Sequence, residues 1–269
     1  MDCLKRGHYF SNHKKTNHLG HLTLTEAESN NEPVDWHYHE NAYFSYTLEG
    51  HCIEKNKKES YEVKPGTLLF HNWQDVHTNG NHSSNSKTLY LEFEKDWYPA
   101  FDCDIAALEG SFNIENPFLK ALFNQIYLEA RIQDETFQLA VESLVLNVFA
   151  LLKKDWPIKN RDNPKWVGTV KEMIHSEFNQ KLSLQDLSLA ANIHPAHLSR
   201  DFSRYFGATL GNYIRRVKVE HAAVLLSGPD SFTEIAYHCG FADQSHFIRC
   251  FKASYNMTPK MFRTKITTR

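Results

Sequence analysis

The sequence predicts a two-domain α+β chain: an N-terminal β-sandwich or barrel followed by two helices, and a C-terminal all-α domain of two helix-turn-helix units joined by a long helix. Three observations predict this class. Short strand-like runs separated by turn residues occupy residues 34–93, helical periodicity begins near residue 116, and one helix-turn-helix pattern is written twice between residues 184 and 251. At 269 residues, the chain is long enough for two domains with their own cores.

The strands are expected in the N-terminal part, where β-prone runs are bounded by glycine, proline, asparagine and lysine. The expected strands cover residues 42–48, 51–55, 59–63, 67–70 and 88–93. Residues before Asn31 are polar and rich in histidine, and only Thr23 and Leu24 suggest an edge strand there. Several short strands at regular spacing favour a sandwich or a barrel.

Two amphipathic helices are expected between residues 116 and 156, with a turn at residues 131–135. The first would cover the open side of the barrel. Apolar residues cover a wider arc of the second helix than packing against one neighbouring element requires, so this helix is the candidate homodimer interface. The apolar residues chosen to test that interface are Leu144, Val148 and Leu152. The charged, proline-bounded residues 157–164 are expected to be a linker between domains covering residues 1–156 and 165–269.

The two helix-turn-helix copies align residue by residue, with one residue added to the second turn. The matched pairs are Leu184 and Phe232, Leu187 and Ile235, Asn192 and Gly240, Ile193 and Phe241, Leu198 and Phe247, Arg200 and Arg249, and Phe202 and Phe251. Asn192 and Gly240 tolerate the left-handed conformation that ends a helix. Pro195 suits the first turn of the next helix, and Asp243 is a candidate cap in the second copy. The second helix of such a unit can enter the major groove of DNA.

The charge distribution supports binding to nucleic acid. Residues 164–269 carry 14 Lys and Arg against 8 Asp and Glu, a net charge of +6, whereas the remaining 163 residues carry 16 against 24, a net charge of −8. The five cysteines include no Cys-x-x-Cys pair, so neither a disulfide framework nor a zinc ribbon is indicated. No signal peptide or membrane-spanning run is visible, and a cytoplasmic protein that does not bind membranes is expected.

The C-terminal hundred residues resemble the AraC/XylS family of bacterial transcription regulators. The residues that carry this resemblance are Ile235-Ala236, Gly240-Phe241, Gln244-Ser245-His246-Phe247, Arg249, Phe251-Lys252 and Thr258-Pro259. The resemblance implies two recognition helices that enter successive major grooves about 34 Å apart on one face of the DNA.

By motif position, the recognition helices present a defined set of residues to the bases. These are Ala196, Ser199 and Arg200 in the first copy and Gln244, Ser245, His246 and Arg249 in the second. Arginine can donate two hydrogen bonds to guanine, and glutamine can pair with adenine. The second copy is therefore expected to read more bases than the first. Other cations are expected on the surface, with a subset facing the DNA backbone: Arg204, Arg215, Arg216, Lys218 and Lys252.

The N-terminal part resembles the cupin-like sensor domain that many members of this family carry. His37-Tyr38-His39, Gly50, Pro65-Gly66 and His77 carry the resemblance. Cupin enzymes usually place a glutamate shortly after the paired histidines, and Tyr43-Phe44 stands there instead, so no cofactor is expected. His37, His39 and His77, completed by His71 or Glu92, remain candidate metal ligands. The favoured alternative is a pocket for a sugar or another small polar metabolite, lined by some of His37, His39, Tyr46, Trp73, His77 and Glu92.

The leading interpretation is a ligand-responsive, DNA-binding transcription regulator that is not an enzyme. Its expected partners are double-stranded DNA, a small-molecule effector, a second copy of itself and, if it activates, RNA polymerase. One alternative is a metal-dependent cupin enzyme with an appended helical domain, which would retain metal through His37, His39 and His77. Another is a regulator whose N-terminal domain serves only dimerisation.

Overall fold

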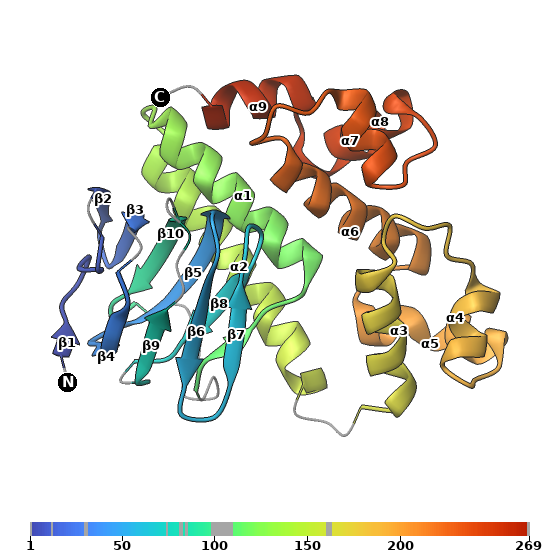
Figure 1. The fold of residues 1–269 in the computed structure, drawn as a ribbon, viewed down its shortest axis with the longest axis horizontal. Coiled ribbons are helices and arrows are strands. Elements are labelled where there is room, and N and C mark those ends of the chain that lie inside the picture. The colour runs from blue at the N-terminus through green and yellow to red at the C-terminus, as the bar shows by residue number, and fades with distance from the viewer. Residues whose placement is uncertain are drawn as a thin grey trace. The chain divides into compact units, whose positions relative to one another are not determined.

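The computed structural model describes residues 2–11, 13–29, 32–73, 75–80, 83, 86–97, 110–159 and 163–267 (Figure 1). The chain forms two compact units, Met1–Asn116 and Pro117–Arg269. The first is built from strands and the second from helices, which confirms the predicted α+β class. None of the described helices combines the length and the apolar character that crossing a lipid bilayer requires.

Two β-sheets make up the first unit. One contains, in spatial order, β1 (Asp2–Leu4), β4 (Val34–His39), β9 (His77–Gly80), β6 (Cys52–Asn56) and β7 (Ser60–Val63). The other contains β11 (Phe112–Asn113), β8 (Leu68–His71), β5 (Ala42–Glu49), β10 (Ser86–Phe93), β3 (Leu22–Ser29) and β2 (His13–Leu19). Within the described residues, the two sheets remain separate hydrogen-bonded sets. The expected barrel is therefore a cupin-like pair of sheets that does not close.

The pleat of the six-stranded sheet sorts its side chains between two buried faces. Phe44 on β5 contacts Phe70 and Phe93 with ring centres 5.0 and 5.5 Å apart, which forms an aromatic core on one face. Tyr43, one residue earlier in β5, lies on the opposite face and stacks on His71. This second face carries the polar pocket described below.

The N-terminal strands correct one expectation from the sequence. Instead of a lone edge strand, β3 is an inner strand that pairs with β10 along its whole length, and β2 forms the edge. Leu22 and Leu24 are buried on one face of β3, and Thr23 and Thr25 are buried on the other. The sequence did not predict β3 as an inner strand because threonine is usually solvent-exposed. Here the threonines line a buried polar face.

The second unit begins with α1 (Pro117–Ile132) and α2 (Phe137–Lys159), which pack against each other. Helix α1 also packs against α6, α8 and α9, and its Ala121 and Leu128 share a core with Phe251 of α8. Because of this shared core, the second compact unit begins at Pro117, before the linker expected at residues 157–164. Residues 157–159 of that linker continue α2, and residues 160–162 lie outside the described residues.

On α2, two of the residues chosen to test a dimer interface are buried within the chain. Val148 has no exposed surface and Leu152 is 6% exposed. Among the side chains of α2 that the structure describes, the exposed large apolar residues are instead Leu139, at 71%, and Leu146, at 37%. They are seven positions apart, about two helical turns, and so lie on one side of the helix.

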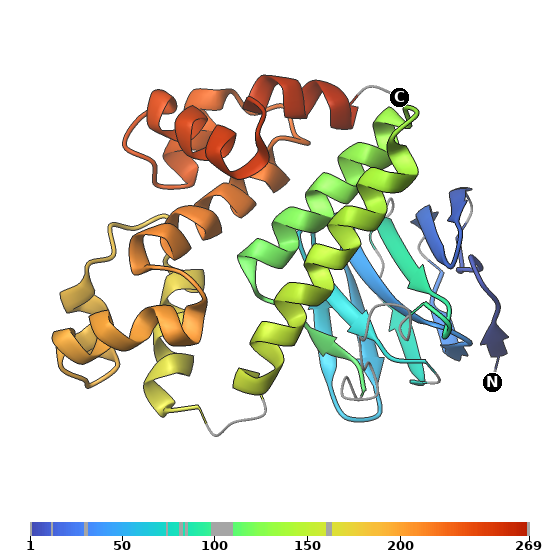
Figure 2. The same cartoon turned by 180° about the vertical axis from the view of Figure 1, so that it is seen from behind.

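The predicted double helix-turn-helix is confirmed (Figure 2). Its helices are α3 (Lys165–Ser176), α4 (Leu184–Ala190), α5 (Pro195–Phe206), α6 (Leu210–Leu225), α7 (Phe232–His238), α8 (Gln244–Tyr255) and α9 (Pro259–Thr267). The joining helix α6 contributes Tyr213 and Val217 to the core of the first helix-turn-helix and Val219 and Ala222 to the core of the second.

The ends of these helices follow the sequence signals. Asn192 and Gly240 have φ values of 51° and 67°, so both adopt the left-handed conformation that the alignment predicts. Pro195 is the first residue of α5, and the Asp243 side chain accepts a hydrogen bond from the backbone N–H of His246 at 2.7 Å. Lys218 was expected on the surface, but the structure places it elsewhere. It is buried, and its Nζ donates to the carbonyl oxygen of Gly240 at 2.6 Å, so it stabilises the second turn.

Candidate functional site

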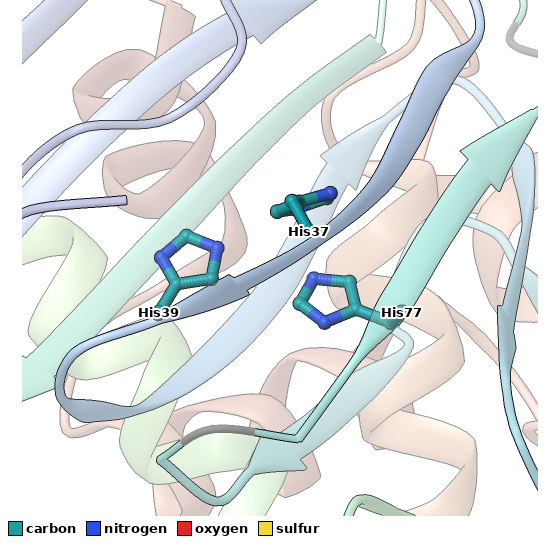
Figure 3. A group of neighbouring side chains, drawn as sticks. All are labelled: His37, His39 and His77. Carbon is teal, nitrogen blue, oxygen red and sulfur yellow. The ribbon is translucent and has the colours of Figure 1, made fainter. Parts of the chain in front are cut away.

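Three buried histidines converge on the polar face inside the first unit (Figure 3). His37 and His39 are two residues apart on β4, so both point to the same face, and His77 is the residue paired with His37 on the neighbouring β9. One ring nitrogen of each histidine lies within 4.8 Å of the others. Strand register therefore brings together the three histidines that the sequence singled out.

Backbone carbonyls fix the orientation of two of these rings. Nδ1 of His37 lies 2.8 Å from the carbonyl oxygen of Asp35, and Nδ1 of His77 lies 3.0 Å from that of Asp75. A ring that donates through Nδ1 keeps the lone pair on Nε2 for another partner. For His77, that nitrogen lies 3.0 Å from the hydroxyl of Tyr43.

Burial keeps the three imidazoles neutral at pH 7. It lowers the pKa of His77 to about 4, with a further contribution from the neighbouring His37. Burial likewise lowers the pKa of His37, and it holds the pKa of His39 well below its ordinary value. The neutral rings can accept hydrogen bonds from a polar ligand or coordinate a metal ion.

Two further buried polar residues, Glu54 and His71, lie close to the histidines. The Glu54 carboxyl is buried on β6, and burial raises its pKa to about 8 although the Asn79 side chain donates a hydrogen bond to it at 3.1 Å. Nδ1 of His71 lies 3.5 Å from the other Glu54 oxygen, and burial holds the His71 pKa well below its ordinary value. At pH 7 this contact joins a protonated carboxyl to a neutral imidazole.

The histidines could hold a transition-metal ion if the rings moved closer together. Nitrogen ligands about 2.1 Å from a tetrahedral metal lie about 3.4 Å from one another. Three neutral imidazoles with two fixed Nδ1 positions suit such an ion, and the Tyr43 hydroxyl lies 3.0 Å from Nε2 of His77. The residues present therefore fit a three-nitrogen site.

The pocket in front of the histidines has a cavity volume of about 50 Å³, with Tyr9, Phe10, Tyr43 and Tyr90 among its lining residues. Tyr9 stacks on Tyr90 with ring centres 3.8 Å apart, and the Phe10 ring meets the edge of His37. A volume of this size holds a few waters or a ligand of a few atoms. A ligand as large as a sugar exceeds this volume.

The remaining residues expected in the pocket lie elsewhere. Tyr46 is buried on the opposite face of β5 from Tyr43 and Ser45, because one step along a strand reverses the direction of a side chain. Trp73 is 42% exposed, and the Lys95 ammonium lies 4.0 Å from its ring centre.

Glu92 does not line the pocket, but it holds Tyr9, which does. Its carboxylate accepts hydrogen bonds from the Gly7 backbone at 2.8 Å, the Tyr9 hydroxyl at 3.2 Å and the Asn41 side chain at 2.8 Å. The sequence missed Tyr9, Tyr90 and Glu54 as pocket residues. Tyr9 lies in a polar segment without periodicity, and the other two are recognised only once the strand register is known.

The two recognition helices, α5 and α8, form a second candidate site. Ala196, Ser199, Arg200, Gln244, Ser245 and Arg249 are exposed, and His246 is half-buried. Nε of Arg200 donates to the Asp201 carboxylate at 3.0 Å, whereas the Arg249 side chain forms no hydrogen bond or ion pair with the described residues. The Gln244 side chain accepts from the Thr233 hydroxyl at 2.7 Å, which leaves its amide N–H groups for another partner.

A β-rich ligand-binding unit followed by two helix-turn-helix units defines a DNA-binding transcription regulator with its own sensor. Family comparisons give the same result. A family described as the AraC-like ligand binding domain matches residues 19–149, and one described as a helix-turn-helix domain matches residues 187–265. The chain belongs to the AraC family of transcription regulators.

Individual relatives are also transcription regulators by name. The chain is 25% identical to the HTH-type transcriptional regulator YdeC of Bacillus subtilis over 254 residues, which are 86% of each chain. It is 27% identical over 125 residues to the Msm operon regulatory protein of Streptococcus mutans, covering 44% of this chain and 45% of that one. A structure of ToxT from Vibrio cholerae aligns with 92% of this chain and all of that one at 14% identity, with a TM-score of 0.40.

Proposed function

We propose that this regulator responds to a small polar effector that binds at His37, His39 and His77. The observation that supports the proposal is the convergence of three buried, neutral imidazoles on one pocket. Their accepting nitrogens suit the hydroxyl or amine donors of a polar metabolite. The effector would act by preferring one conformation of the regulator, and so change its affinity for DNA. The protein would act in the cytoplasm and would not be an enzyme.

A divalent transition-metal ion is the second candidate effector, because the same three nitrogens suit such an ion. Thermal-shift measurements with Zn²⁺, Co²⁺ and a panel of small polyols and sugars distinguish the two. We expect one class to raise the melting temperature of the wild type, and His39→Ala to remove the shift. His18→Ala, which replaces a histidine on β2 outside the pocket, is the matched control. A sensor that only dimerises predicts no shift with any ligand, and a metal-dependent enzyme predicts stoichiometric metal retained through purification.

We also propose that α8 contributes more to base recognition than α5. Arg249 is free of intramolecular partners among the described residues, whereas Arg200 is paired with Asp201. An arginine that must break an ion pair with a carboxylate before it binds guanine contributes less binding free energy than an arginine without such a pair.

Gel-shift titration with DNA from upstream of the protein's own gene tests this assignment at matched salt. Arg249→Ala is expected to weaken binding to the preferred site by about 1–3 kcal/mol, and Arg200→Ala by less. If both variants bind as tightly as the wild type, the proposed reading residues are wrong.

The regulator is further proposed to act as a homodimer through the exposed side of α2, where Leu139 and Leu146 lie. Two sensors held together would place up to four recognition helices on one DNA site. If the protein activates transcription, RNA polymerase is the partner that the bound dimer would contact.

A further inference from the structure

Residues 177–182, between α3 and α4, link the two helix-turn-helix units by contacts that are separate from the chain connection through α6. Phe178 packs against the cores of both units. Its ring stacks on His221 of α6, with the ring centres 3.6 Å apart and the planes 3° from parallel. We call residues 177–182 the bridging segment. It follows α3, whose Val170 and Ile174 are buried in the core of the first helix-turn-helix.

The backbone of the bridging segment lies directly against the second turn, residues 239–243. A Cβ atom on Gly240 would be 2.1 Å from the carbonyl oxygen of Asn179 and 2.6 Å from its carbonyl carbon. Glycine, which has no Cβ atom, lets the two main chains approach this closely. The turn leads into α8, which begins at Gln244. A segment of the first helix-turn-helix therefore contacts the turn that positions the second recognition helix.

Lys218 of α6 donates hydrogen bonds to both sides of this contact. Its Nζ lies 2.6 Å from the carbonyl oxygen of Gly240 and 3.4 Å from that of Gln180. The side chain is buried, and a buried ammonium group is costly unless it is hydrogen-bonded. Hydrogen bonds from a charged donor are also stronger than those between neutral groups. Movement of the second turn away from the bridging segment would leave this buried charge with one acceptor fewer.

The bridging segment and α1 contact opposite sides of α6. The guanidinium carbon of Arg216 lies 5.1 Å from the centre of the Phe118 ring on α1. Glu220, four positions later on the same side of α6, accepts a hydrogen bond from Asn124 of α1. Lys218 is two positions from each of these α6 residues, about 200° around the helix, so it faces the other way. The joining helix is therefore held from two sides, which limits its bending.

We propose that the bridging segment and Lys218 fix the distance and rotation between the two recognition helices, and so set the spacing of base pairs that the regulator accepts. One base pair inserted between two contacted segments of DNA moves the second by about 3.4 Å and rotates it by about 34°. Recognition helices held at one distance and one rotation cannot follow that change. The proposal rests on the assignment of both α5 and α8 to base reading. Lys218 is a positioning residue, which acts through Gly240 without touching DNA.

Two variants weaken the contacts of the bridging segment. Lys218→Met removes both hydrogen bonds and keeps a long, unbranched side chain. His221→Ala removes the stacking on Phe178 and decides the test if Lys218→Met does not fold. Phe262→Leu is the control, because it weakens the core of the second helix-turn-helix through ring contacts with α8. Melting temperatures are measured for all four proteins.

The probe is a labelled duplex that the wild type selects from a random-sequence pool. A scan of single-base substitutions locates the two segments of base pairs that are read, which are expected about one helical turn apart. One base pair is then inserted between them. Fluorescence anisotropy gives the dissociation constants of each protein for the selected and the altered duplex. Their ratio, the spacing penalty, is unaffected by the fraction of protein that is folded, because the same sample binds both duplexes.

We expect a spacing penalty of about tenfold for the wild type and for Phe262→Leu, because a displaced recognition helix loses base contacts. The penalty should fall to about threefold or less in Lys218→Met and in His221→Ala, whose recognition helices can adjust to the altered duplex. An undiminished penalty in folded Lys218→Met would overturn the proposal, and so would a wild type that tolerates the inserted base pair. An equal fall in Phe262→Leu would also overturn it, because reduced stability alone would then explain the change.

Failure of the base-reading assignment gives a different result. If the scan locates a single read segment, α5 and α8 do not both read bases, and the spacing proposal falls together with that assignment. Two read segments with the same spacing penalty in the wild type and in the bridging variants overturn the spacing proposal alone.

Discussion

Gly240 and Asn192 occupy the same position in the two helix-turn-helix units, yet their surroundings differ. Both have positive φ values, which asparagine and glycine tolerate better than other residues. A Cβ atom on Gly240 would lie 2.1 Å from the carbonyl oxygen of Asn179, which is too close for any side chain. Asn192 has room for its own side chain, which is exposed.

Gly240→Ala is therefore expected to destabilise the protein by several kcal/mol, on the order of 3, because it combines backbone strain with a clash against main-chain atoms. Asn192→Gly, at the equivalent position, should change the free energy of unfolding by less than about 1 kcal/mol. Thermal melting followed by circular dichroism measures both. Equal melting temperatures for the two variants would contradict the proposed role of the Asn179 contact.

At the scale of whole elements, a buried polar network joins α1 to the joining helix α6 and to α8. Nδ2 of Asn124 on α1 donates to the Tyr255 hydroxyl at 2.8 Å and to the Glu220 carboxylate at 3.2 Å. The Tyr255 hydroxyl lies 3.1 Å from both Glu220 oxygens. Burial raises the pKa of Glu220 to about 7, although the nearby Arg216 acts in the opposite direction. These bonds fix how the three helices pack.

This raised pKa predicts a pH-dependent stability. Between the ordinary carboxyl pKa of 4.5 and the folded value of about 7, the folded state keeps a proton that the unfolded state has lost. The contribution of Glu220 to the free energy of unfolding is therefore greatest below the ordinary value. It declines as pH rises toward the folded value, by an amount on the order of 3 kcal/mol.

Glu220→Gln removes this titration while keeping the shape of the side chain. The melting temperature of the variant relative to the wild type should rise between about pH 5 and about pH 8. Burial also raises the pKa of Glu54, to about 8, so Glu54 gives a pH dependence of stability with the same sign. Both proteins contain Glu54, and its effect therefore cancels in the comparison. Parallel pH profiles for the two proteins would show that Glu220 has no raised pKa.

At the scale of the whole molecule, the sensor half is acidic and the DNA-binding half is basic. This separation confines the excess of positive charge to the half that carries the recognition helices α5 and α8. The proposed homodimer would form through a different, apolar surface, the side of α2 that carries Leu139 and Leu146.

Replacing both of these residues by glutamate is expected to convert a dimer into a monomer, because two pairs of facing carboxylates would repel across the interface. Light scattering coupled to size-exclusion chromatography measures the mass. Leu189→Glu, which changes an exposed leucine on α4 outside this surface, should remain dimeric. A wild type of monomeric mass at micromolar concentration would rule out this interface.

The sequence by itself determined the features that depend on local pattern. The repeated apolar spacing predicted both helix-turn-helix units, and the residues that end or begin their helices, Asn192, Gly240 and Asp243, followed from backbone and capping preferences. Five strands of the sensor, β5, β6, β7, β8 and β10, were predicted where β-prone runs alternate. Their expected ends lie within one or two residues of the observed ones, as in β5 and β10.

The tertiary structure alone decided which residues meet. Strand register paired His37 with His77 and turned Tyr46 away from the pocket, since a step of one residue reverses a side chain and no local pattern fixes that step. Packing of α1 against α6 and α8 buried Asn124 beside Glu220 and Tyr255. These contacts join residues far apart in the chain, and only the folded chain brings them into contact.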